Sequence, residues 1–134
     1  MTAQKGRDLL LKVQSGADFQ TVAGLRATTL SFNAESVDAT SQESGAWREL
    51  LAGAGLRSAS LRGQGIFKDA ASDATVRQLF FDGAIVPWRV MLPDFGMIEG
   101  PFQVTALDYG ARHDAEVTFE LALASAGPLS FTVL

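Results

Sequence analysis

Two segments in the last third of the chain alternate strictly between apolar and polar residues, and this restricts the fold more than any other sequence feature. The segments are residues 98–106 and 115–123. A period of two places alternate side chains on opposite faces of a strand. Residues 108–114 between them are turn-prone, so the pattern predicts a β-hairpin. The apolar residues expected to point into a core are Ile98, Phe102, Val104, Val117, Phe119 and Leu121.

Shorter patterns predict the remaining elements. Strands are expected over residues 7–13, 19–32 with a bend or turn at Gly24, 56–67, 85–92 and 129–134. A helix is expected over 69–83, with Ser72 or Asp73 as its cap and Gly83 at its end. The order contains no βαβ repeat. It predicts a mainly β fold, an antiparallel β-sandwich or barrel of about seven strands, with one flanking α-helix and a short helical turn.

The short helical turn is expected over residues 47–54. Trp47, Leu50 and Leu51 would share one face of it. We predict that these three side chains form a structural anchor that supports the strand beginning at Leu56. A tryptophan can also stack on a sugar ring, but at the start of an apolar helical face it is more often a core or interface residue.

A polar segment at about 33–45 has almost no residues suited to a core. Its polar members include Asn33, Glu35, Asp38, Gln42 and Glu43. We expect a long surface loop or an extended hairpin arm, and long loops in compact domains are usually functional or disordered.

Composition limits the class of protein. The chain has 134 residues, which predicts one domain over 1–134. It has no cysteine, which excludes disulfides and cysteine nucleophiles and fits synthesis in the cytoplasm. The formal net charge of −4 argues against a basic nucleic-acid clamp. No apolar run approaches the roughly 20 residues of a membrane helix, and no export signal is visible, so no membrane insertion is expected.

No pattern predicts a catalytic, metal or cofactor site. His113 is the single histidine, whereas a zinc site needs three or four ligands. Residues 63–65 read Gly-Gln-Gly but do not open a helix, so a bulge or a close backbone approach is expected there instead of a dinucleotide site. Glu116 and Glu120 would lie about 13–14 Å apart on a strand, too far to act as an acid–base pair. The chain is therefore not expected to be an enzyme and needs no cofactor.

The order of several short motifs resembles that of the major tail tube proteins of long-tailed phages, and within them most closely the version carried by gene transfer agents. The resemblance covers nearly the whole chain. Its motifs are residues 6–13, 45–51, 54–58, 63–69, 92–96, 99–104 and 123–128.

This resemblance implies a β-sandwich subunit that assembles with itself into hexameric rings. The rings would stack head to tail into a hollow tube that conducts DNA from the capsid to a recipient cell. Implied partners are the tape-measure protein, tail-terminator and distal tail proteins, and DNA passing without sequence-specific contacts. The subunit would assemble in the bacterial cytoplasm and become part of the tail of a released virion-like particle.

Two sets of residues acquire expected roles from the resemblance. The polar segment would reach a neighbouring subunit through Asn33, Glu35, Asp38, Gln42 and Glu43. The polar hairpin face would line the lumen or, alternatively, the exterior of the tube. The lumen candidates are Glu99, Gln103, Thr105, Glu116, Thr118 and Glu120. Rival interpretations are a related tube, baseplate or tail-terminator protein, a monomeric β-sandwich that binds glycans, and, last, a hydrolase.

Overall fold

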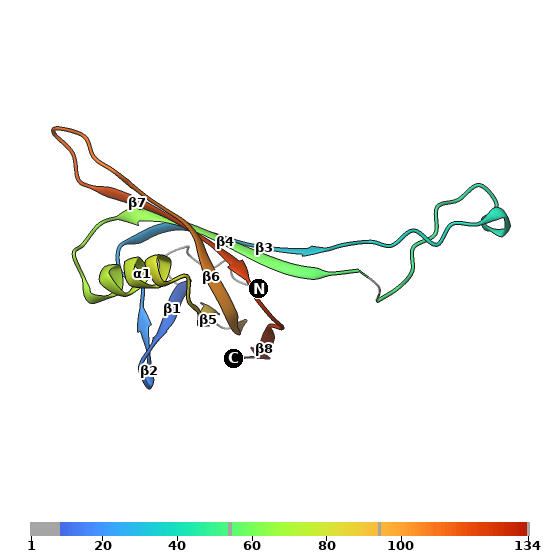
Figure 1. Ribbon diagram of the computed structural model, residues 1–134, viewed down its shortest axis with the longest axis horizontal. Coiled ribbons are helices and arrows are strands. Elements are labelled where there is room, and N and C mark those ends of the chain that lie inside the picture. Colours follow the sequence, from blue (N-terminus) through green and yellow to red (C-terminus); the bar gives the residue numbers. More distant parts are fainter. Residues whose placement is uncertain (1–8, 54, 94, 134) are drawn as a thin grey trace.

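The computed structural model describes residues 9–53, 55–93 and 95–133. These residues form eight strands, one α-helix and one 3₁₀ turn (Figure 1). The strands are β1 (Leu10–Ser15), β2 (Asp18–Thr21), β3 (Leu25–Ala34), β4 (Arg57–Ile66), β5 (Ile85–Leu92), β6 (Gly96–Gly110), β7 (Thr118–Ser125) and β8 (Ser130–Val133). The helix α1 spans Ala71–Asp82, and the 3₁₀ turn spans Gln42–Ser44. Residues 7 and 8 of the first predicted strand lie outside the described residues.

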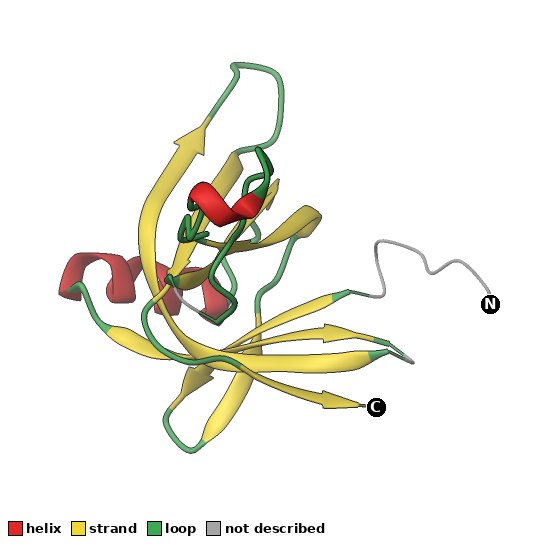
Figure 2. Cartoon of the chain, turned by 90° about the vertical axis from the view of Figure 1, so that its right-hand side faces the viewer, coloured by secondary structure: helices red, strands yellow, loops and turns green. Residues whose placement is uncertain are grey.

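The strands form an antiparallel sheet that folds back on itself. Its order is β2-β1-β5-β6-β7-β4-β3, with β8 paired to β6. β6 is 15 residues long and belongs to both halves: its residues 96–103 pair with β5, and its residues 102–110 pair with β7. Figure 2 shows the two layers that result. The predicted mainly β, antiparallel fold is confirmed, with eight strands in the described residues where about seven are expected.

The core lies between these two layers, and helix α1 adds the buried Val76 and the partly buried Leu79 to it. Its buried members are Leu11, Val13, Val22, Ala59, Leu61, Val76, Trp88, Val90, Ile98, Phe102, Val104, Phe119, Leu121 and Leu123. Five of the six side chains predicted to point inward from the hairpin are among them. The prediction is wrong for Val117, which precedes β7 and is 38% exposed.

Helix α1 begins and ends through specific backbone contacts. The Asp73 carboxylate accepts a hydrogen bond from the backbone N–H of Ala70 at 2.9 Å, which satisfies one free donor at the helix start. Ser72 is not a cap: its hydroxyl accepts from the backbone N–H of Ala23 at 3.0 Å and ties the helix to the segment between β2 and β3. Gly83 ends the helix in the left-handed conformation with φ 63°, as predicted.

The start of β3 approaches the end of β4 closely because two glycines meet there. Gly24 has φ +81°, and its carbonyl accepts a hydrogen bond from the Ile66 N–H at 3.0 Å. A Cβ at Gly65 would lie 2.0 Å from the Gly24 carbonyl oxygen, a distance that no side chain tolerates. The predicted turn at Gly24 and the predicted close backbone approach at 63–65 are both confirmed.

Candidate functional site

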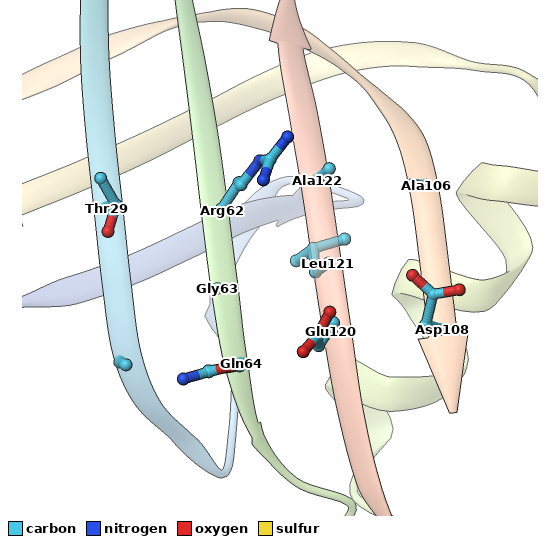
Figure 3. Close-up of a pocket in the computed structure, with 10 residues that line it drawn as sticks. Thr29, Arg62, Gly63, Gln64, Ala106, Asp108, Glu120, Leu121 and Ala122 are labelled. Atoms are coloured by element: carbon cyan, nitrogen blue, oxygen red, sulfur yellow. The ribbon is translucent and has the colours of Figure 1, made fainter. Parts of the chain in front are cut away.

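The first candidate site is a polar face of the sheet, formed by the antiparallel pairs β3–β4 and β6–β7. We call it the polar wall: the face, opposite the core, of β3, β4, β7 and residues 104–110 of β6. A hollow of about 450 Å³ runs along it. Figure 3 shows the hollow with Arg62, Gln64, Glu120 and Asp108 on adjacent strands. The lining residues are Ala27, Thr29, Arg62, Gly63, Gln64, Ala106, Asp108, Glu120, Leu121 and Ala122.

The wall is organised in rows that cross the strands. One row reads Ala27–Gln64–Glu120–Asp108, because these residues are directly opposite one another in successive strand pairs. The next row reads Thr29–Arg62–Ala122–Ala106. Each chain therefore places two carboxylates in one row and a guanidinium in the next, about 7 Å away along the strands.

A β-bulge at Thr105 decides which residues of β6 face the wall. The register of β6 with β7 shifts between Val104 and Ala106, and the Thr105 hydroxyl donates to the carbonyl of Ala122 at 3.2 Å. A bulge inserts one extra residue and reverses the alternation beyond it. Asp108 thereby joins the wall and lies directly opposite Glu120. Two like charges in such a pair repel each other, so this arrangement lowers the stability of the isolated chain.

The six residues predicted for one polar face do not share it. Gln103, Thr118 and Glu120 lie on the face of the wall, and Thr105 occupies the bulge. Glu116 lies in the loop before β7. Glu99 belongs to the other half of the sheet, where it forms an ion pair with Arg89, which is opposite it on β5.

Glu99 differs from the carboxylates of the wall because its charge has a partner. The Arg89 guanidinium carbon lies 3.7 Å from the centre of the Phe19 ring, a cation–π contact, while its Nε donates to Glu99. The negative charge of Glu99 is thus paired with the positive charge of Arg89, whereas the described structure gives Glu120 and Asp108 no ion-pair partner. The prediction of one acidic row containing both Glu99 and Glu120 is wrong. Glu99 lies in the part of β6 that pairs with β5, whereas Glu120 lies on β7 in the other layer.

Sequence reasoning missed three charged or polar residues of the wall. Arg62 and Gln64 belong to the alternating pattern of β4, in which the glycines 63 and 65 stand at core-facing positions and hide the apolar period. The sequence predicts a turn at Asp108, because nothing in it marks the bulge that extends β6 to Gly110.

The second candidate site is the arm, which we define as residues 35–53, 55 and 56. The sequence predicts a surface loop or an extended hairpin arm at about 33–45. The structure has two paired branches that continue beyond 45, whereas Asn33 lies in β3 opposite Ser58. Figure 1 shows it projecting far from the body of the molecule. Backbone hydrogen bonds hold its two branches together: Glu35 N to Leu56 O at 2.7 Å, Leu51 N to Val37 O at 2.8 Å and Ala39 N to Glu49 O at 2.9 Å.

Local hydrogen bonds shape the end of the arm. The Thr40 N–H donates to the Asp38 carboxylate at 2.8 Å, and hydrogen bonds from the Thr40 side chain and backbone hold the pKa of Asp38 below its usual value. Ser41 and Ser44 exchange side-chain and backbone contacts around the 3₁₀ turn. These bonds give the end a defined shape without a core of its own.

The predicted anchor is wrong. No helix forms over the described residues between 47 and 53, and Leu50 forms an isolated bridge with Asp38 instead. Trp47 is 79% exposed, Leu51 54% and Leu50 49%, so none of them supports the strand from Leu56 within the subunit. The arm carries these apolar side chains into solvent together with four carboxylates and one arginine, Arg48.

Two kinds of site are absent from the part of the chain that the structure describes. No group of three or more histidine, cysteine or acidic side chains lies close enough together to hold a metal ion there. Among the helices described, none has the length and apolar character needed to cross a membrane.

The sequence and the fold are both similar to those of proteins from phage and phage-like tails. A sequence model of the phage tail tube protein family matches residues 3–131. No curated protein matches the sequence significantly. The chain is 56% identical to the subunit in the tail of an empty GTA particle with C6 symmetry, with a TM-score of 0.93 over 98% of this chain and 100% of that one.

Two further solved structures are similar. A chain in the virion of a native gene transfer agent particle is 57% identical, with a TM-score of 0.92 over 98% of this chain and 100% of that one. The SPP1 tail tube shares only 13% identity but has a TM-score of 0.77, over 97% of this chain and 79% of that one. At that identity the likeness shows a common fold.

Proposed function

The chain belongs to the phage tail tube protein family and is a structural subunit of a tail tube, and on this premise we propose that hexameric rings of it stack head to tail into the tail of a gene transfer agent. The similar GTA tail has C6 symmetry. Head-to-tail stacking suits a molecule whose arm projects from one end of its body (Figure 1). The role is structural, without enzymatic activity.

The polar wall, in this proposal, lines the lumen. It is hollowed, and the core covers its other face. Each hexameric ring would present about twelve wall carboxylates and about six arginines, a net negative surface for DNA. Phosphates are repelled from such a wall, whereas a lysine- or arginine-rich wall would bind them by releasing counterions.

The effect of these charges is local. At ~0.15 M salt, screening limits electrostatic interactions in water to about 8 Å, so a duplex meets the wall charges only where it comes close. Few side chains of the wall could form hydrogen bonds with a base or a sugar, because several of them are small: Ala27, Thr29, Ala106 and Ala122. DNA would therefore pass without sequence-specific contacts.

The arm, in the same proposal, contacts a neighbouring subunit. Its exposed Trp47, Leu50 and Leu51 have no cover within the chain. Burying them against another copy is the simplest way to remove this apolar surface from water. The polar residues Glu35, Asp38, Gln42 and Glu43 would frame that contact, whereas Asn33 lies in β3, outside the arm.

The remaining partners follow from position in a tail. A tape-measure protein would occupy the lumen before DNA does, and tail-terminator and distal tail proteins would contact the first and last rings. The subunit would be assembled in the bacterial cytoplasm and released within the particle.

A matched pair of glutamate variants tests the lumen assignment. Glu120→Lys changes the wall, and Glu116→Lys changes the loop four residues away. We expect both to form tubes by electron microscopy, and only Glu120→Lys to reduce DNA transfer, more strongly at low salt because phosphate binding is salt-sensitive. Equal transfer by the two variants in intact tubes would place Glu120 outside the lumen.

A further inference from the structure

One cation lies among the carboxylates of the polar wall. Of the described residues that line the hollow, Arg62 alone carries a positive charge. Its side chain is exposed on β4 and forms no ion pair with another described residue. An exposed arginine is ordinary on a protein surface. This one, however, lies in the hollow assigned above to the lumen, where its charge is available to the molecule that occupies the tube.

Arg62 can carry its charge further from the sheet than the carboxylates of the wall can. The residues directly beside it in its row are small, Thr29 on β3 and Ala122 on β7. They leave the long arginine side chain without cover on either side. The side chains of Asp108 and Glu120 are shorter, so their charges stay closer to the strands.

The carboxylates of the wall do not use the donors of this guanidinium. Asp108 and Glu120 belong to the neighbouring row, about 7 Å away along the strands. Figure 3 shows the Arg62 side chain directed away from Glu120. At ~0.15 M salt the screening length is about 8 Å, so attraction over this separation is already weakened. The positive charge of Arg62 is therefore only partly compensated.

We propose that Arg62 is the contact of the polar wall with the phosphates of DNA inside the tube. A guanidinium presents its N–H donors in a planar fork that matches a phosphate with two hydrogen bonds. Phosphate contacts carry no sequence information, so such a site accepts any DNA. This inference rests on the proposed lumen and names the group that touches the molecule in it.

The surrounding carboxylates keep this contact weak. In the proposed hexameric ring, about six guanidinium groups form one band, and the carboxylates of the next row repel phosphates on one side of it. DNA is therefore held briefly at one band in each ring and released again. The contact slows DNA without stopping it, and it weakens as the salt concentration rises, because each bound phosphate releases counterions.

Retention of a short fluorescent DNA duplex by tubes with open ends measures the contact. Tubes would be sedimented with the duplex at a series of salt concentrations, after electron microscopy has shown that each variant forms them. Arg62→Gln removes the charge at an exposed position, where the loss should not affect folding. Arg112→Gln is the matched control, because it removes the same charge from the exposed loop after β6. Arg62→Lys keeps the charge and loses the planar fork.

We expect Arg62→Gln to weaken retention about 10-fold and to lower the slope of log affinity against log salt by about 1. Arg112→Gln should behave like the unmodified chain, and Arg62→Lys should lie between the two. No retention by unmodified tubes, retention unaffected by Arg62→Gln, or an equal loss with Arg112→Gln would overturn the phosphate contact.

An acidic segment of a protein is the rival occupant of this site. A fluorescent oligoglutamate peptide tests it in the same tubes. Tighter retention of the peptide than of the duplex, lost in Arg62→Gln, would overturn the assignment to DNA.

The Glu120→Lys variant separates failure of this site from failure of the lumen assignment. Increased retention of the duplex by Glu120→Lys, together with no effect of Arg62→Gln, would refute the phosphate contact and leave the lumen standing. Unchanged retention by both variants in intact tubes would refute the lumen assignment and the phosphate contact together.

Discussion

Replacing Trp47 by alanine should weaken assembly and leave the subunit as stable as before. Trp47 is 79% exposed at the end of the arm. An aromatic side chain buries about 150–250 Å² when fully covered, so assembly could remove roughly 160 Å² of Trp47 surface from water. At about 25 cal/mol per Å² this corresponds to ~4 kcal/mol. Ordering of the arm offsets part of it, leaving about 2 kcal/mol, or roughly a 30-fold rise in the critical concentration for tubes.

Sedimentation at a series of concentrations measures that rise, and thermal unfolding of the subunit measures stability. Trp47→Phe is the matched control, because it keeps an aromatic ring and should lose less assembly than alanine does. A buried tryptophan would instead cost about 3–5 kcal/mol and lower the melting temperature by roughly 10 °C or more. Such a drop, or tubes that form at the wild-type concentration, would refute the role assigned to the arm.

Three further predictions follow from single features. Replacing residues 37–54 by a short turn should leave a folded subunit that forms no tubes; normal tubes in the electron microscope would exclude the arm as a connector. Trp88 is fully buried and its Nε1–H has no hydrogen-bond partner in the described structure, so Trp88→Phe should cost less than ~2 kcal/mol, against about 3–5 for Trp88→Ala; denaturant unfolding compares the two, and equal losses would contradict this. The lowered pKa of Asp38 means that its contribution to the end of the arm is complete above the usual value of 3.8 and is lost as the pH falls through the lowered one. The Thr40 amide signal should therefore titrate with a midpoint below 3.8, and a higher midpoint would show that the hydrogen bond is absent.

Local patterns in the sequence determined those parts of the protein that depend on neighbours along the chain. The alternation around Phe102 and Phe119 predicted two strands and their buried faces, because the strand period needs no knowledge of the partner. Gly83 predicted the helix end and Gly24 a turn, because both conformations favour a residue without a side chain. The polar composition of 33–45 predicted a surface loop or an arm, because this segment has almost no apolar side chains to bury.

The tertiary structure alone decided which side chains meet. The bulge at Thr105 turns Asp108 onto the wall, and it arises from pairing with a strand more than ten residues away. The passage of β6 between layers separates Glu99 from Glu120, although both stand on the polar parity of one predicted hairpin. Trp47 has an apolar helical pattern around it but no surface within reach, since the arm extends away from the core. Periodicity shows which face of a helix or strand is apolar. Whether that face is buried depends on contacts between distant residues and, in this family, between copies of the chain.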